Sequence, residues 1–209
     1  MCGIVGHVVP AGERPDQAAV QRAVQQLAHR GPNDSGIVEF NTACLGHRRL
    51  SIIDLGGSPQ PWSSQDERYT IIFNGEIYNY LELRQDLESS GVHFRTQGDT
   101  EVLLAMYMKY GERCLEKLNG MFAFAVWDNT ARRLLIARDR VGKKPLFYAV
   151  FKTRDRIRIG TRSAARLHCH RPRARSGGDR GLFRLPIHSS ASHYLPLGPE
   201  TASSALSAL

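Results

Sequence analysis

The sequence predicts one α+β domain built on antiparallel sheets, followed by a basic tail of low order. Short apolar segments rich in branched and aromatic residues are numerous, and several are joined by the short turns typical of hairpins. Helical segments lie between them without the regular strand–helix alternation of a parallel sheet. The 209 residues, 42% of them hydrophobic, are enough to bury a core without disulfides or metals.

The first elements lie within residues 1–50. A buried strand is predicted at residues 2–9, where small and β-branched apolar residues follow one another. A helix is predicted at 15–29, with a proline in its first turn and an apolar face made by Ala19, Val20, Ala23, Val24 and Leu27. The turn-rich segment 29–36 is expected to be a loop. Paired strands at 37–40 and 43–50 should follow.

The middle of the chain is predicted to mix strands and helices. A strand at 69–73 is expected to end at Asn74 and Gly75, because this dipeptide is typical of tight turns. The expected helices are at 81–89 and 100–110. The remaining predicted strands are 121–127, 134–138, 146–151 and 157–159, of which the first two form a hairpin.

The positive charge is concentrated at the C-terminal end. The formal net charge is +8, but residues 1–153 carry 18 Lys and Arg against 17 Asp and Glu. Residues 154–209 carry 10 against 3, and all ten cations are Arg. From Arg162 onward the chain is rich in Arg, Ala and Ser and lacks a sustained period, which predicts low order. We therefore expect a domain at residues 1–160 and a basic tail at 161–209.

Several kinds of site and location are disfavoured by composition. The four cysteines lack CxxC spacing, which argues against a zinc ribbon and a secreted disulfide framework. His7, His47 and His93 lack metal-ligand spacing, so they are interpreted as packing or surface residues and no metal site is predicted. No apolar stretch reaches the length of a membrane span, and the N-terminus does not resemble a signal peptide. We expect no membrane association and a reducing, cytoplasmic location.

Cys2 is the most informative single residue. A small residue at position 2 permits removal of Met1, which would leave Cys2 with both a thiol and a free α-amine. The α-amine has a reference pKa of about 7.7–8.0, so it can accept the thiol proton near neutral pH. Taken alone, Cys2 would be better interpreted as an ordinary buried strand cysteine that keeps Met1. Further motifs are needed to favour a nucleophile.

Seven sequence blocks supply those motifs. They are MCGIVG at residues 1–6, HRGP at 29–32, HRRLSI at 47–52, FNGEIYN at 73–79, GDTE at 98–101, NGMFAF at 119–124 and ARDRVGKKPL at 137–146. Each block alone is weakly specific. Their order and spacing between Cys2 and about Gly160 resemble the glutamine-hydrolysing half of the asparagine synthetase family. That half is a class II glutamine amidotransferase of the N-terminal-nucleophile (Ntn) hydrolase type.

The resemblance implies a fold and a reaction. The fold is a four-layer αββα sandwich of two antiparallel sheets between helices. The reaction is hydrolysis of L-glutamine to L-glutamate and ammonia, the ammonia-releasing step of asparagine biosynthesis, and it needs no cofactor. The Cys2 thiolate attacks the side-chain amide, ammonia leaves, and water releases glutamate from the thioester. The loop at 29–32 would position the nucleophile.

The resemblance also assigns the substrate contacts. Asn74 and Gly75 would form an oxyanion hole through the Asn amide and the Gly N–H, although Asn-Gly alone is more commonly a hairpin turn. Arg49 would hold the substrate α-carboxylate in a bidentate contact. Asp99, assisted by Glu76, would hold the α-ammonium. Asp99 could also be the N-cap of the following helix.

Beyond residue 160 the chain departs from the family pattern. The synthetase half, which uses ATP and Mg to activate aspartate, is expected to be absent, and we interpret the chain as truncated or frameshifted before it. A separate synthetase subunit or another ammonia acceptor would then be the partner. One alternative is a catalytically inactive fragment that only binds a partner. A nucleic-acid binder is disfavoured, because the tail lacks interleaved aromatic residues.

Overall fold

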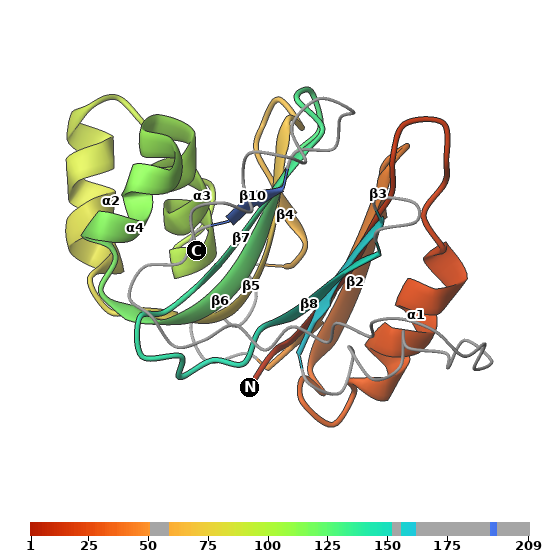
Figure 1. Ribbon diagram of the computed structural model, residues 1–209. Coiled ribbons are helices and arrows are strands. Elements are labelled where there is room, and N and C mark those ends of the chain that lie inside the picture. The colour runs from red at the N-terminus through yellow and green to blue at the C-terminus, as the bar shows by residue number, and fades with distance from the viewer. Residues whose placement is uncertain (51–58, 152–155, 162–192, 196–209) are drawn as a thin grey trace, which may run out of the picture.

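Two antiparallel sheets lie face to face in the computed structural model of the protein, and helices cover both outer faces (Figure 1). The structure describes residues 1–50, 59–151, 156–161 and 193–195. The layers follow in the order α1, first sheet, second sheet, and the pair α2 and α3. The four-layer αββα sandwich expected from the sequence is confirmed.

The first sheet contains the N-terminal strand at its centre. Its order is β2-β3-β1-β9-β8, with bounds Asp34–Glu39, Ala43–Arg49, Gly3–Val8, Arg156–Gly160 and Phe147–Phe151. Helix α1 (Gln17–Gln26) covers its outer face and begins after Asp16, whose carboxylate accepts a hydrogen bond from the Ala19 N–H at 2.9 Å. The helix and sheet bury a shared cluster of Val5, Val20, Ala23, Val24, Leu27 and Cys44.

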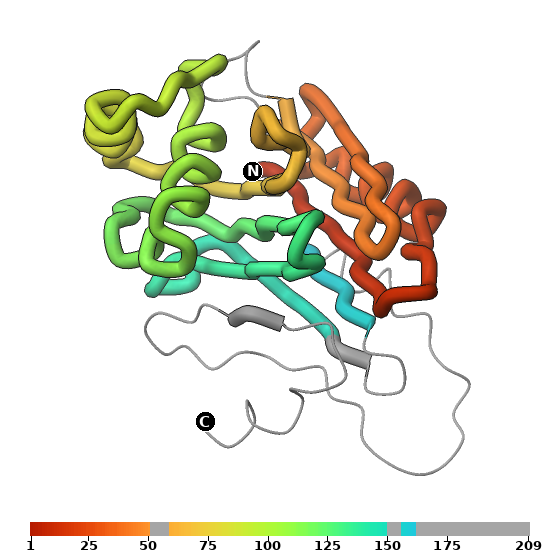
Figure 2. Tube along the Cα trace, turned by 90° about the horizontal axis from the view of Figure 1, so that it is seen from above, coloured from red at the N-terminus to blue at the C-terminus, as the bar shows by residue number. Residues whose placement is uncertain are grey.

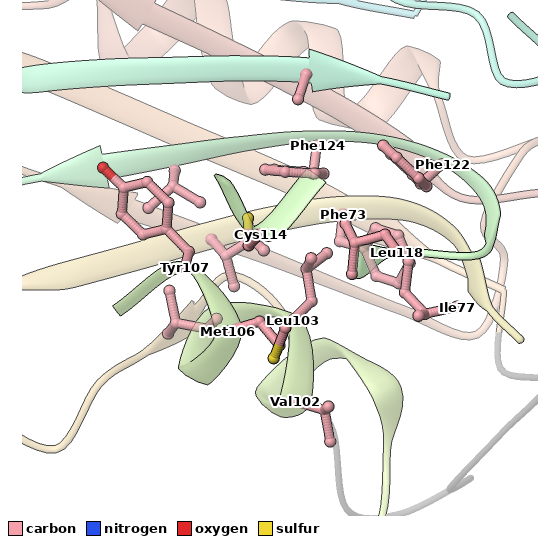
Figure 3. Close-up of a cluster of buried hydrophobic side chains, with 14 of the residues drawn as sticks. Phe73, Ile77, Val102, Leu103, Met106, Tyr107, Cys114, Leu118, Phe122 and Phe124 are labelled. Atoms are coloured by element: carbon pink, nitrogen blue, oxygen red, sulfur yellow. The ribbon is translucent and has the colours of Figure 1, made fainter. Parts of the chain in front are cut away.

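The second sheet has the order β10-β7-β6-β5-β4. Its strands are His193–Leu195, Arg133–Arg138, Gly120–Asp128, Tyr69–Ile77 and Trp62–Ser63. Helices α2 (Tyr80–Ser89) and α3 (Asp99–Tyr110) cover the outer face, and a short 3-10 turn, η1 (Gly111–Arg113), leads into α4 (Cys114–Lys117). Figure 3 shows the apolar cluster that joins these helices to β5 and β6, with Leu103 and Met106 of α3 facing the strands.

A third apolar cluster fills the space between the sheets. Because successive residues of a strand face opposite sides, each central strand contributes alternate side chains to this cluster and to an outer one. Ile4 and Ile72 pack between the sheets, whereas their neighbours Val5 and Ile71 pack with the outer helices. The alternation holds both sheets in register with their helices.

One polar contact crosses this apolar layer. His47 of β3 is fully buried and donates from Nε2 to the carbonyl oxygen of Phe73 in β5 at 3.0 Å. Burial lowers the pKa of His47 to about 4, so the ring is neutral near pH 7. The contact fixes β3 against β5, which are the strands that carry Arg49 and Asn74.

Most predicted elements agree with the structure to within one residue at each end. Helix α1 is shorter than the predicted 15–29, because Asp16 caps its first turn and Leu27 takes the C-cap position. Strand β4 and the short segments η1 and α4 were not predicted. They contain two to four residues each, too few to show a period in the sequence.

Two strands are longer than predicted. Strand β2 begins at Asp34 rather than at residue 37, because its pairing with β3 continues until Asp34 meets Arg49. Strand β5 does not end at Asn74 but continues through Gly75 to Ile77, since its pairing with β6 continues as well. The predicted strand end at Asn74 and Gly75 is wrong. Both residues lie inside a strand.

Strand β10 lies within the tail for which low order is predicted. It pairs antiparallel with β7, with Tyr194 opposite Leu135, and so supplies hydrogen-bonding partners to the exposed edge of that strand. Apart from Thr161 and β10, the predicted tail lies outside the described residues.

Candidate active site

One cleft gathers all six site residues that the sequence predicts. Its volume is about 70 Å³, and its lining includes Cys2, Arg49, Asn74, Gly75, Glu76 and Asp99. Cys2 precedes β1, Arg49 ends β3, residues 74–76 lie in β5, and Asp99 begins α3. In Figure 2 the N-terminus lies at the junction between the red and orange segments and the segments that carry β5 and α3. Four separate stretches of chain thus meet at the cleft.

The Cys2 side chain is partly buried and contacts the end of β3. The Leu50 N–H lies 3.4 Å from Cys2 Sγ, and the thiol lies 3.6 Å from the Leu50 carbonyl oxygen. Burial raises the pKa of the Cys2 thiol, whereas the Leu50 N–H, the N-terminal amine, Arg49 and Lys144 oppose that rise. The thiol therefore needs help to lose its proton.

The N-terminal amine lies in the same surroundings. The structure includes Met1, whose side chain is exposed, and partial burial lowers the pKa of its α-amine. Arg30 and Lys144 lower this pKa further by charge repulsion, while the Cys2 thiolate raises it. An amine at this place is more often unprotonated near neutral pH than an ordinary N-terminus.

The loop between α1 and β2 contacts the backbone of Cys2. Arg30 Nε donates to the Cys2 carbonyl oxygen at 3.2 Å. A Cβ on Gly31 would lie 2.4 Å from the Arg48 carbonyl carbon and 2.5 Å from the Arg49 nitrogen, so the loop packs directly on β3. This arrangement supports the predicted positioning role of residues 29–32.

Asn74 and Gly75 are held tightly within β5. Asn74 is 1% exposed, and its Nδ2 has no hydrogen-bond partner among the described residues. A Cβ on Gly75 would lie 2.3 Å from the Met121 carbonyl oxygen, so the approach of β6 requires glycine here. A buried amide donor without a partner is unusual and suits a site that awaits an acceptor.

The pairing of β5 with β6 fixes the direction of the Gly75 N–H. Phe122, opposite Gly75, donates its N–H to Asp139 Oδ2 at 3.2 Å and accepts from the Asp139 N–H at 2.8 Å. Both main-chain groups of Phe122 therefore face β7. Gly75 and Phe122 form a non-hydrogen-bonded pair, in which the Gly75 N–H points to the other edge of β5.

At that edge the two flanking N–H groups have partners. The Phe73 N–H donates to Gln60 Oε1 at 2.7 Å, and the Ile77 N–H donates to Asp99 Oδ2 at 3.0 Å. For the Gly75 N–H between them, the described part of the chain provides no acceptor. The Asn74 amide and the Gly75 N–H are therefore two unpaired donors at the cleft, as stabilisation of an oxyanion requires.

Asp99 is a buried carboxyl group that lines the same cleft. It is 7% exposed, and burial raises its pKa to about 6; the nearby Glu76 carboxylate adds to this effect. The N-cap position of α3 is taken by Gly98, so Asp99 is not the N-cap that the sequence offered as an alternative. Its Oδ2 instead accepts from β5, and the pair of acids can attract a cation.

Arg49 supplies positive charge at the end of β3. It is 7% exposed and lines the cleft, whereas its neighbour Arg48 is half-buried and does not line it. The two side chains therefore face opposite sides of the strand, as successive residues of a strand do. A guanidinium at this place can bind a carboxylate through two hydrogen bonds.

Three polar side chains of the lining, Gln60, Thr100 and Lys144, were not selected from the sequence. Gln60 connects β5 to α3, because its Oε1 accepts from Phe73 and its Nε2 donates to Thr100 Oγ1 at 3.2 Å. Lys144 brings a second buried cation to the cleft. Lys144 and Thr100 belong to the sequence blocks 137–146 and 98–101, which could have indicated them, whereas Gln60 had no recognisable signal.

The described part of the chain contains neither a cluster of metal-ligating side chains nor a helix that could span a membrane. No group of three or more His, Cys, Asp and Glu side chains there could hold a metal ion. Among the same residues, none of the helices is long and apolar enough to cross a membrane.

Most of the chain is similar in sequence to known proteins. Residues 1–174 match the glutamine amidotransferase domain family. The chain is 48% identical over 151 residues to asparagine synthetase 1 (glutamine-hydrolyzing) of Bacillus subtilis. The aligned region covers 71% of this chain and 24% of that protein. It is 42% identical over 121 residues to asparagine synthetase B of Escherichia coli, covering 58% and 22%. The resemblance seen in the seven blocks is confirmed, and the chain spans about a quarter of the length of these relatives.

Solved structures share the architecture. The allosteric regulatory enzyme of purine biosynthesis superposes with a TM-score of 0.65 at 23% identity, covering 79% of this chain and 43% of that one. Glutamine phosphoribosylpyrophosphate amidotransferase from B. subtilis gives 0.61 at 22% identity, covering 76% and 41%. At such low identity the likeness concerns the fold.

Proposed function

Because the chain belongs to the glutamine amidotransferase domain family, we propose that it hydrolyses L-glutamine to L-glutamate and ammonia with Cys2 as an N-terminal nucleophile. The observation that carries this proposal is the cleft itself. A thiol, two unpaired donors, a buried guanidinium and two carboxylates meet there from four separate stretches of chain.

The first step forms a thioester. After Met1 is removed, the α-amine of Cys2 takes the thiol proton and the sulfur attacks the side-chain carbonyl carbon of glutamine. The carbonyl oxygen becomes an oxyanion and accepts hydrogen bonds from Asn74 Nδ2 and the Gly75 N–H. The C–N bond then breaks, and the proton held by the amine goes to the leaving nitrogen, which departs as ammonia.

The second step restores the enzyme. Water attacks the thioester carbon, and the α-amine accepts a proton from that water. The same two donors stabilise the second oxyanion, after which the C–S bond breaks and the thiol regains its proton. The net reaction consumes glutamine and water and yields glutamate and ammonia, so no redox partner or cofactor is needed.

The charges of the cleft match the zwitterionic end of glutamine. Arg49 would bind the α-carboxylate through two hydrogen bonds, and Asp99 with Glu76 would bind the α-ammonium. These groups would hold the side-chain amide toward Cys2. Opposite charges from separate elements of the fold favour an amino acid over an amide that lacks either charged group.

The fate of the ammonia belongs to the same proposal. The similar relatives are named asparagine synthetases, and this chain spans about a quarter of their length. We infer that ammonia passes to a synthetase subunit or another acceptor, and that ATP and Mg would act only there. A thiol nucleophile must stay reduced, which fits a cytoplasmic location.

Glutamate release by the purified protein tests the proposal. Mass spectrometry first establishes whether the N-terminus begins at Cys2, and glutamate is then measured after incubation with glutamine. We expect release from protein that lacks Met1 and none from Cys2→Ala. Folded protein without Met1 that releases no glutamate would count against an enzyme, and retained Met1 would favour a module that only binds a partner.

A further inference from the structure

Lys144 is a buried cation in the cleft that the reaction scheme does not use. It is 8% exposed and lines the cleft together with Met1 and Cys2. Among the ion pairs formed by described residues, none includes Lys144. Lysines are rarely buried without a paired acid, so its position calls for a physical reason.

The loop that carries Lys144 is fixed by Asp139. The buried carboxylate of Asp139 accepts the N–H groups of Lys143 at 2.7 Å, Lys144 at 3.0 Å and Phe122 at 3.2 Å. The Gly142 N–H also donates to the Asp139 carbonyl oxygen at 2.9 Å. Asp139 thereby ties the loop to β6, the partner strand of Gly75, and holds Lys144 at the cleft.

The positive and the negative side chains near the N-terminus interact with different groups. Arg30, Arg49 and Lys144 act on the thiol or the amine, while the acids of the cleft, Glu76 and Asp99, interact with each other. Lys144 lies beside both groups in the cleft, where it lowers the pKa of the Cys2 thiol and the pKa of the Met1 α-amine. Arg30 also interacts with both groups, but it does not line the cleft and its Nε donates to the Cys2 carbonyl oxygen, while Arg49 acts on the thiol.

We propose that Lys144 is an electrostatic partner of Cys2 that favours the neutral amine and the thiolate together. This inference rests on the proposed function, because only an N-terminal nucleophile needs both states. An amine that serves as a base must be unprotonated, and a cation nearby disfavours a second positive charge. The same cation stabilises the negative sulfur. Lys144 therefore acts through Cys2 rather than on glutamine.

The pH dependence of Cys2 alkylation tests this directly. Protein lacking Met1 is treated with iodoacetamide, and modification is followed by mass on the peptide that begins with Cys2. Replacing Lys144 with Met keeps the apolar stem and removes the charge, so the midpoint should move to higher pH by about one unit. Lys144→Gln should behave alike, and Lys144→Arg should keep the original midpoint.

Lys143→Met is the matched control. Lys143 is the adjacent residue, is exposed, and also donates its N–H to Asp139, so its replacement should leave the midpoint unchanged. In glutamine hydrolysis, the acid limb of kcat/KM should shift with the alkylation midpoint while KM changes little. A raised KM with an unchanged alkylation midpoint would overturn the proposal and assign Lys144 to substrate binding.

The alkylation assay needs no turnover of glutamine. A protein that hydrolyses no glutamine yet shows the shift would contradict the proposed function and leave the role of Lys144 supported. If the protein hydrolyses glutamine but the alkylation midpoint does not shift in Lys144→Met or Lys144→Gln, the proposed function is supported and the role of Lys144 is contradicted.

Discussion

Asn74 and Gly75 lie inside a strand and at the same time offer hydrogen-bond donors to the cleft. Each is part of a strand buried on both sides, and each keeps one donor without a partner among the described residues. The neighbouring N–H groups of Phe73 and Ile77 are bonded to side chains, which leaves only the central donors for a ligand. Rigid donors of this kind stabilise developing charge without having to reorganise.

Replacing Asn74 with Ala should therefore slow the chemical step more than it weakens binding. We expect kcat to fall by about 100-fold with a small change in KM, because the donor acts on the oxyanion rather than on bound glutamine. Steady-state kinetics provide the measurement. Alkylation of Cys2 in the same variant should proceed at the normal rate, and a kcat within twofold of the parent would remove Asn74 from the oxyanion hole.

Asp99 should make glutamine binding depend on pH. Burial raises its pKa to about 6, so below that pH the empty cleft holds a neutral acid that cannot pair with an ammonium. The affinity of Cys2→Ala for glutamine should rise with pH up to about 6, by as much as tenfold per unit, and then level off. Calorimetric titration measures this directly. Asp99→Asn should bind weakly at every pH, and an unchanged profile in that variant would contradict the assignment.

The end of strand β5 could not be predicted from the local sequence pattern. Asn-Gly is a common hairpin turn, and nothing in the adjacent residues distinguishes that use from a strand interior. What continues the strand is its pairing with β6, some fifty positions away, and the fit of Gly75 beneath Met121. Conversely, helices α2 and α3 and strands β1, β6 and β7 could be predicted to within a residue at each end, because their apolar patterns are local.

Gly75→Ala should test this close approach of two strands. An added Cβ would meet the Met121 carbonyl oxygen at 2.3 Å, and neither strand can move without breaking ladder bonds. Unfolding in urea should show a loss of about 1–3 kcal/mol, as overpacked sites do. Gly91→Ala, where nothing lies within 4 Å but φ is +89°, measures the cost of backbone strain alone and should be smaller. Equal losses would contradict the packing argument.

The whole molecule explains why the site could be anticipated only in part. Cys2, Arg49 and Asp99 could be chosen because sequence blocks resembled a family, and the fold then brings these distant residues together. Gln60 reaches the same cleft through a side-chain bridge between β5 and α3 that no local pattern reveals. Lys144 lies in the block 137–146, but its place in the cleft comes from a loop organised by Asp139. Their presence depends on tertiary packing.

The two sheets also account for how the cleft is kept rigid. The cleft lies where β3 of one sheet meets β5 of the other, and the neutral His47 joins these strands across an otherwise apolar layer. Both sheets are supported from outside by helices, so the residues on their inner edge have little freedom to move (Figure 1). A site built from several strands gains its precision from this packing.

The central claim is that Cys2, with its own free amine, attacks the side-chain carbonyl of glutamine. Labelling with a glutamine analogue that carries a diazoketone in place of the amide tests it most directly. The thiol proton passes to the diazo carbon, dinitrogen leaves, and the sulfur bonds to that carbon as a thioether that water does not hydrolyse. We predict a single adduct on the peptide that begins with Cys2, prevented by excess glutamine and absent in Cys2→Ala. An adduct on Cys44 or Cys114, or labelling that glutamine does not prevent, would contradict the account.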